Sequence, residues 1–151
     1  KFVFAHLIVP HIPFLFEPDG SVVTDPGYYS GKLLEPIDHD YLVRGYTNQV
    51  QFIDNRIIEV ARQILENSST PPIIVIQGDH GMENENHLVI LNAYYLPGEG
   101  DQAMYASITP VNSFRVIFNT YFGGTYELLP DISYSKTGEA IVETYSQCVS
   151  P

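Results

Sequence analysis

The segment "PPIIVIQGDHG", residues 71–81, joins an apolar run to two side chains of the kinds that bind metal ions. Asp79 offers a carboxylate oxygen and His80 an imidazole nitrogen, a mixture that suits zinc, manganese or iron better than an all-oxygen calcium site. Neighbouring residues of a strand point to opposite faces, so both reach one ion only where the strand has ended and the backbone turns. Gly78 and Gly81 permit such a turn. Two ligands do not complete a site, and a plain turn with a capping aspartate is the alternative.

Two further histidines accompany another apolar run, "FVFAHLIVPH". His6 and His11 would lie on opposite faces of an unbroken strand, but Pro10 interrupts the strand and allows them to converge. His11 lies at the strand end between two prolines and is a functional candidate, whereas for His6 a hydrogen-bonded core histidine is the alternative. His87 and the cluster 38–40 (Asp-His-Asp) could also bind a metal, but each lies in a polar stretch typical of a surface loop.

The elements that must position these side chains follow from the hydrophobic pattern. Almost continuous apolar runs at residues 2–9 and 73–76 predict strands buried on both faces, and residues 88–98 have the composition of a third strand. Apolar positions three and four apart predict a helix from about Tyr41 to Asn67. A helix between two buried strands is typical of a βαβ unit with parallel strands, so polar residues after each strand are expected at one edge of the sheet.

Two further elements are predicted from local signals. Thr109 is a helix-capping residue followed by a proline suited to the first helical position, and Gly123 is a stop signal, so a second helix is expected at about residues 110–122. The Pro-Asp-Gly turn at residues 18–20 predicts a small hairpin.

Length and composition bound the class of protein. The 151 residues suit a single domain, residues 1–151, and the formal charge of -11 argues against a nucleic-acid partner, which needs clustered Lys and Arg. Cys148 is the one cysteine, which excludes an internal disulfide, and no apolar run is long enough to span a bilayer, so the chain as given is expected to be soluble. The chain begins without Met and in an apolar run, which suggests a fragment.

The order of these segments resembles the C-terminal half of a sulfatase-like catalytic domain of the alkaline phosphatase superfamily. "FAHLIVPHIPFLFEPDG", a long helix, "PPIIVIQGDHG", "LNAYYLPG" and "SITPVNSFRVIFNTYFG" follow one another as in the branch of lipoteichoic acid synthase and the phosphoethanolamine transferases. The resemblance covers about residues 2–134. It implies a three-layer α/β sandwich with a mostly parallel sheet flanked by helices, of which this chain is an incomplete, C-terminal portion.

The resemblance also implies roles for matching residues. Asp79 and His80 would ligate a catalytic divalent metal, which could be zinc, manganese, calcium or magnesium. His11 would contact the oxygens of the ester or help to hold a second metal, and His6 has the spacing of a further histidine in the phosphoethanolamine transferases. No residue matches the later metal-site histidine of these relatives, because His87 lies in a segment that departs from them.

The expected function is therefore part of a metal-dependent hydrolase or transferase acting on sulfate or phosphate esters. In the family the hydroxyl nucleophile and an early acidic ligand lie upstream, so this fragment alone should be inactive and needs the N-terminal half of its own domain. The parent is expected to be anchored in a membrane with its catalytic domain on the extracytoplasmic side. The alternative is a non-catalytic binding or structural domain that retains the same fold.

Overall fold

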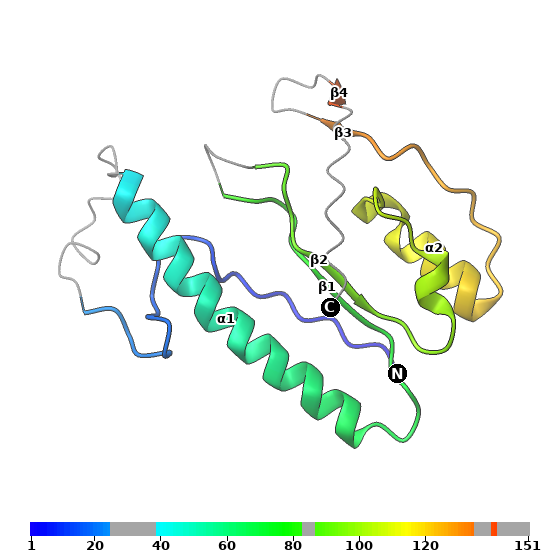
Figure 1. Cartoon of the computed structure of the whole chain (residues 1–151), viewed down its shortest axis with the longest axis horizontal. Coiled ribbons are helices and arrows are strands. Elements are labelled where there is room, and N and C mark those ends of the chain that lie inside the picture. The colour runs from blue at the N-terminus through cyan, green and yellow to red at the C-terminus, as the bar shows by residue number, and fades with distance from the viewer. Residues whose placement is uncertain (25–38, 83–86, 135–139, 142–151) are drawn as a thin grey trace. The chain divides into compact units, whose positions relative to one another are not determined.

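The computed structural model describes residues 1–24, 39–82 and 87–134, and the backbone of residues 140–141 (Figure 1). Helices and strands are both present, so the fold is mixed α/β. The chain divides into two compact units, residues 1–67 and residues 68–151. No helix within the described ranges is both long and apolar enough to cross a membrane. Asp38 and Cys148 lie outside the described residues.

Helix α1, His39–Asn67, is the main element of the first unit (Figure 1). It confirms the predicted helix and starts slightly before the predicted residue. Asn67 closes the last turn, since its Nδ2 donates to the carbonyl of Gln63 at 2.8 Å. The predicted apolar stripe is only partly covered. Ile53 and Ile57 are half-buried, whereas Val60 and Ile64 are 53% and 41% exposed.

A tight hairpin precedes α1 and confirms the predicted Pro-Asp-Gly turn. Phe16 and Val22 form an antiparallel bridge across it. Gly20 has a φ of 86°, a left-handed conformation that glycine adopts without strain. The Asp19 carboxylate accepts hydrogen bonds from the backbone N–H and the hydroxyl of Ser21, at 2.8 and 2.6 Å. The turn is therefore closed by bonds within its own residues.

The fully buried side chain of Gln49 joins α1 to the loop that leads into this hairpin. Its Oε1 accepts from the backbone N–H groups of Leu15 at 2.7 Å and Phe16 at 3.4 Å. Its Nε2 donates to the carbonyls of Pro10 and His11, each at 3.2 Å. A buried amide has to satisfy both its donor and its acceptor, and four bonds to one loop do so.

Aromatic rings pack the same loop against α1. The ring of Phe14, 4% exposed, lies directly on Gly45, where any Cβ atom would collide with it. The ring of Phe16 stacks on that of Phe52 with centroids 4.7 Å apart. The hydrophobic core of this unit therefore consists largely of loop aromatics against one face of the helix.

The predicted strand at residues 2–9 is wrong. These residues are all described, yet they form no strand, and the side chains of Phe2, Phe4 and Ile8 are 78%, 79% and 70% exposed. A strand exists only through hydrogen bonds to a neighbour, and among the described strands none pairs with this segment. Composition alone therefore does not make this apolar run a strand.

The second unit is built around two short strands, β1 at Ile74–Gln77 and β2 at Asn92–Tyr95. They confirm the strands expected near residues 73–76 and 88–98, although β2 is shorter than its apolar run and both strands are half-buried rather than buried on both faces. The two are antiparallel, with Ile74 opposite Tyr95 and Gln77 opposite Asn92.

A second antiparallel pair joins β3, Ser133–Tyr134, to β4, Ala140–Ile141. The strand pairs in the described part of the chain are thus antiparallel, and the mostly parallel three-layer sandwich that was predicted is not shown by them.

Helix α2, Pro110–Phe122, has the predicted bounds (Figure 1). Thr109 is its N-cap residue and Gly123 its C-cap, the latter with a left-handed φ of 66°. Val116 and Ile117 are 5% and 3% exposed. Local start and stop signals therefore fixed this helix, and it carries the hydrophobic side chains that are buried among the described residues of the second unit.

The segment between β2 and α2 contains a short 3-10 helix, η2, at Gly100–Ala103. Tyr121 of α2 donates a hydrogen bond from its hydroxyl to the carbonyl of Pro97 at 2.7 Å. The same hydroxyl occupies the space beside Gly100, so no larger residue fits at that position. This contact fixes the path of the loop along the helix.

Candidate functional site

Asp79 and His80 follow β1 at a bend in the backbone. One carboxylate oxygen of Asp79 accepts from the His80 backbone N–H at 3.0 Å, and the other lies 3.9 Å from His80 Nε2. The two side chains therefore come together on one side of the chain. The prediction that the strand ends before this pair and that the backbone turns is confirmed.

The hydrogen bonds of His80 determine which ring nitrogen is available. Its Nδ1 lies 2.7 Å from the carbonyl oxygen of Gly81. A carbonyl only accepts, so Nδ1 carries the proton and, in the neutral ring, Nε2 carries the free lone pair. Histidines that ligate metals usually donate their other ring nitrogen in this way, which fixes the tautomer and the orientation of the ring. Nε2, the nitrogen nearer to Asp79, is thus the one free to bind a ligand.

The spacing of this pair suits a shared ion. Two ligands of a tetrahedral zinc ion lie about 3.3 Å apart when each is about 2.0 to 2.1 Å from the metal. The 3.9 Å between Asp79 Oδ2 and His80 Nε2 differs from this by an amount that a side-chain rotation can supply. Among the residues that the structure describes, no group of three or more His, Cys, Asp or Glu side chains could hold a metal. Asp79 and His80 are thus a pair without a third such side chain among the described residues.

His87 lies against His80, although its sequence surroundings indicated a surface loop. Its ring stacks on that of His80, with centroids 4.7 Å apart and planes inclined by 29°. Its Nδ1 is buried, and it is the single buried side-chain nitrogen or oxygen without a hydrogen-bond partner among the described residues. A buried, unpaired nitrogen is costly, so this atom stands out from the rest of the unit.

The backbone explains how a residue that far along the chain reaches His80. Beyond the paired strands, Gly78 N–H donates to Leu91 O at 2.9 Å and Gly81 N–H to His87 O at 2.8 Å. The hairpin thus continues past its ladder and brings residues near 87 opposite residues near 80. The sequence signal was available in principle, since an antiparallel pairing of the two apolar runs places His87 there, but a mostly parallel sheet was predicted, with no pairing of these two runs.

The remaining predicted site residues belong to the first unit. His11 is exposed, its carbonyl is held by Gln49, and its Nδ1 bonds the carbonyl oxygen of Ile12, which again leaves Nε2 as the free nitrogen. His6 is exposed as well, with its ring 6.5 Å from that of Phe4, so a core histidine is wrong for this position. The expected approach of His11 to Asp79 stays a prediction.

The histidine of the Asp-His-Asp cluster lies at the start of α1. His39 Nδ1 is 3.8 Å from a carboxylate oxygen of Asp40, and both side chains are well exposed. Asp40 in the first turn stabilises a helix through its interaction with the helix dipole. The surface interpretation of these two residues agrees with this placement.

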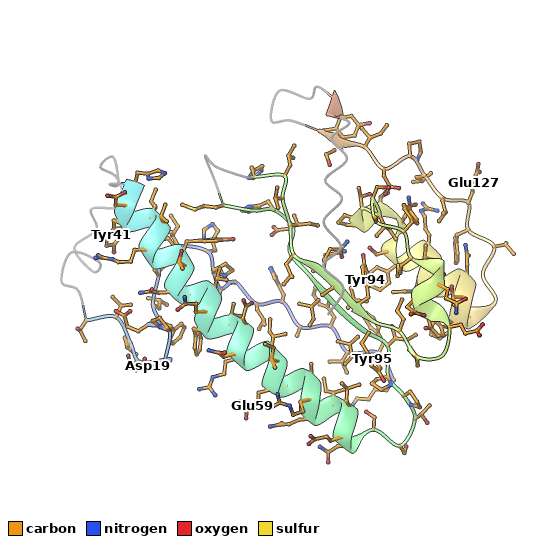
Figure 2. All side chains as sticks on the ribbon, viewed as in Figure 1. Asp19, Tyr41, Glu59, Tyr94, Tyr95 and Glu127 are labelled. Atoms are coloured by element: carbon orange, nitrogen blue, oxygen red, sulfur yellow. The ribbon has the colours of Figure 1, made fainter. Side chains whose placement is uncertain are left out.

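A polar cluster fastens the end of β1 to α2. Ser113 is fully buried, and its hydroxyl lies 2.6 Å from the hydroxyl of Tyr94, which extends from β2 toward α2 (Figure 2). Gln77 Nε2 donates to the same Ser113 oxygen at 3.2 Å and to Asn92 Oδ1 at 2.9 Å. Because Gln77 is two residues before Asp79, this cluster fixes where the chain enters the candidate site.

A second network surrounds the start of α2. The Asp131 carboxylate accepts from the N–H and the hydroxyl of Thr109, at 2.7 and 2.6 Å, and from Tyr105 at 2.6 Å. The fully buried Asn112 donates to Leu129 O at 2.7 Å and accepts from Leu129 N–H at 2.9 Å. These residues hold the segment after α2 against the start of the helix.

This network changes the acidity of its members. Burial would raise the pKa of Asp131, but the hydrogen bonds from Thr109, Tyr105 and Asn112 outweigh it and lower this pKa below its usual value. Burial and the hydrogen bond to Asp131 raise the pKa of Tyr105. A carboxylate at a helix N-terminus is also favoured by the helix dipole. The ionised form of Asp131 is therefore the one that holds this region together.

Comparisons with family models, curated proteins and solved structures find no match to this chain.

Proposed function

We propose that this chain is part of a metal-dependent hydrolase or transferase that acts on sulfate or phosphate esters, and that Asp79 and His80 bind its divalent cation. The observation that carries this proposal is the hydrogen bonding of the His80 ring and the position of its Nε2 atom. Its Nδ1–H is committed to Gly81 O, and its Nε2 lies 3.9 Å from the Asp79 carboxylate. Such a pair offers one hard oxygen and one imidazole lone pair to the same ion. The order of the motifs, which resembles sulfatase-like enzymes, supports the same class.

The other residues have roles that follow from this proposal. His11 contacts the ester oxygens with its free Nε2, and His6 contributes to a metal site. The attacking hydroxyl belongs to a segment upstream of residue 1. When bound, a divalent cation would neutralise charge on the oxygens of the phosphoryl or sulfuryl group. The finer fold, a three-layer sandwich with a mostly parallel sheet, and a membrane-anchored parent with an extracytoplasmic catalytic domain are parts of the same proposal.

The test is hydrolysis of an aryl sulfate and an aryl phosphate by the full-length protein, with and without added Zn²⁺, Mn²⁺, Mg²⁺ or Ca²⁺. Asp79→Ala should lower the metal-dependent rate by at least about a hundredfold, because it removes a ligand of the ion. Asp101→Ala is the matched control, since Asp101 is exposed in the same unit and its carboxylate accepts, among the described residues, only the N–H of Gln102, at 3.0 Å.

Full activity in Asp79→Ala would contradict the metal role. A full-length protein that binds the cation but hydrolyses neither ester under any of these conditions would instead support the alternative, a non-catalytic binding domain. Equilibrium dialysis of Zn²⁺ and Mn²⁺ against the same variants separates loss of the ion from loss of the reaction.

A further inference from the structure

We infer that His87 is a positioning residue, whose ring face holds the His80 imidazole in the orientation that leaves Nε2 toward Asp79. This inference rests on the proposed metal role of Asp79 and His80. His87 acts through His80 and does not itself bind the ion that this pair holds.

The geometry of the two rings separates positioning from ligation. A metal lies in the plane of an imidazole that ligates it, because the nitrogen lone pair lies in that plane. The His80 and His87 planes are inclined by only 29° and their centroids are 4.7 Å apart. Among the described residues no group of three or more His, Cys, Asp or Glu side chains could hold a metal, so His87 does not join Asp79 and His80 as a third ligand there. The contact between the two residues is face to face.

The surroundings of His87 support the same role. Its carbonyl accepts from Gly81 N–H at 2.8 Å, and Gly81 O accepts from His80 Nδ1 at 2.7 Å. One residue, Gly81, thus connects the backbone of His87 to the ring of His80, while the side chain of His87 covers the face of that ring. The His80 ring is held at its Nδ1 edge by Gly81 O and on one face by the His87 ring. Its Nε2 edge is left available.

The buried Nδ1 of His87 indicates which part of the side chain matters. This atom has no hydrogen-bond partner in the described structure, so it contributes nothing favourable where it lies. A flat, apolar ring of similar size should therefore position His80 equally well. It should also be better tolerated by the fold, since it has no nitrogen to desolvate.

The experiment compares His87→Phe and His87→Ala in the full chain, with His39→Ala as a control for an exposed histidine elsewhere. Long-range ¹H–¹⁵N spectra of the metal-free protein report the His80 tautomer, and titration with Zn²⁺ reports its affinity. We expect the wild-type tautomer and an affinity within about twofold in His87→Phe, with a higher midpoint of thermal unfolding. In His87→Ala we expect a mixture of His80 tautomers and an affinity lower by about tenfold, as for other residues that orient metal ligands. His39→Ala should change neither.

Equal loss of Zn²⁺ affinity in His87→Phe and His87→Ala would overturn the inference, because it would show that a His87 nitrogen is needed. An unchanged tautomer and affinity in both variants would overturn it as well. His80→Ala tests the underlying proposal separately. If that variant binds Zn²⁺ as the wild type does, the metal role fails, while the tautomer spectra of the metal-free variants still decide whether His87 positions His80.

Discussion

The loop that carries His11 and the loop that carries His80 are held in different ways. The first is held by a buried side chain from a distant helix, Gln49, whose donor and acceptor are both used. The second is held by its own backbone and by a ring contact, and it contains the buried, unpaired nitrogen of His87. The first arrangement is typical of a structural clamp. In the second loop, the buried Nδ1 of His87 lowers the stability beside the residues proposed to bind an ion. Such unfavourable features persist where function requires them.

The largest effect is expected where the first loop loses its clamp. Gln49→Met keeps the length and helix propensity of the side chain but removes its part-buried bonds to the Leu15 N–H and to the carbonyls of Pro10 and His11. We expect a loss of about 3 kcal/mol in the free energy of unfolding, measured by denaturant titration. Gln63→Met on the same helix is the control, because the Gln63 side chain is exposed and, among the described residues, bonds only the side chain of Glu59, at 3.4 Å. A similar loss in both variants would show that the helix, and not the clamp, is being measured.

A smaller effect is expected at Asp131, whose network holds the start of α2 in the unit that carries the second loop. Asp131→Asn keeps the shape but removes the charge that accepts from Thr109 and Tyr105, and should cost about 1 to 2 kcal/mol near neutral pH. The pKa of Asp131 is lowered from the model-compound value of 3.8 in the folded state. Its contribution is therefore fully present above that value and is lost as the pH falls through the folded pKa.

The pH dependence gives this prediction its own control. Unfolding curves of the wild type and of Asp131→Asn should differ most near neutral pH, and the difference should shrink as the pH falls below 3.8, because protonation removes the charge from the wild type too. A difference that stays constant over this range would mean that the ionised carboxylate is not what stabilises α2.

The smallest effect is expected at the second loop itself. The Asp79 side chain is 92% exposed, and among the described residues its carboxylate accepts a hydrogen bond only from the N–H of His80. Asp79→Ala should change the metal-free stability by no more than about 0.5 kcal/mol. Added Zn²⁺ should then raise the thermal midpoint of the wild type and leave that of the variant unchanged, since only a ligand that binds the folded state stabilises it. A large loss of unfolding free energy in the metal-free Asp79→Ala variant would show that Asp79 is a structural residue. The contrast between the two loops would then not hold.

The sequence predicted the elements that depend on local signals. Helix α2 has the expected bounds because Thr109, Pro110 and Gly123 act within a few residues of where they stand. The hairpin at Gly20 and the turn that brings Asp79 beside His80 were predicted for the same reason. The strand predicted at residues 2–9 does not form, because a strand needs a partner and the composition of one segment does not supply it.

The contacts that hold the two loops depended on the tertiary structure. Nothing near Gln49 in the sequence indicates that it bonds Pro10 and Leu15, and nothing near His87 indicates that its ring covers that of His80. By itself the sequence determined which side chains can bind a metal and where helices begin and end, since these follow from residue type and short spacing. The antiparallel register of β1 and β2 and the partner of each buried polar group were decided only by folding, because they join residues far apart in the chain.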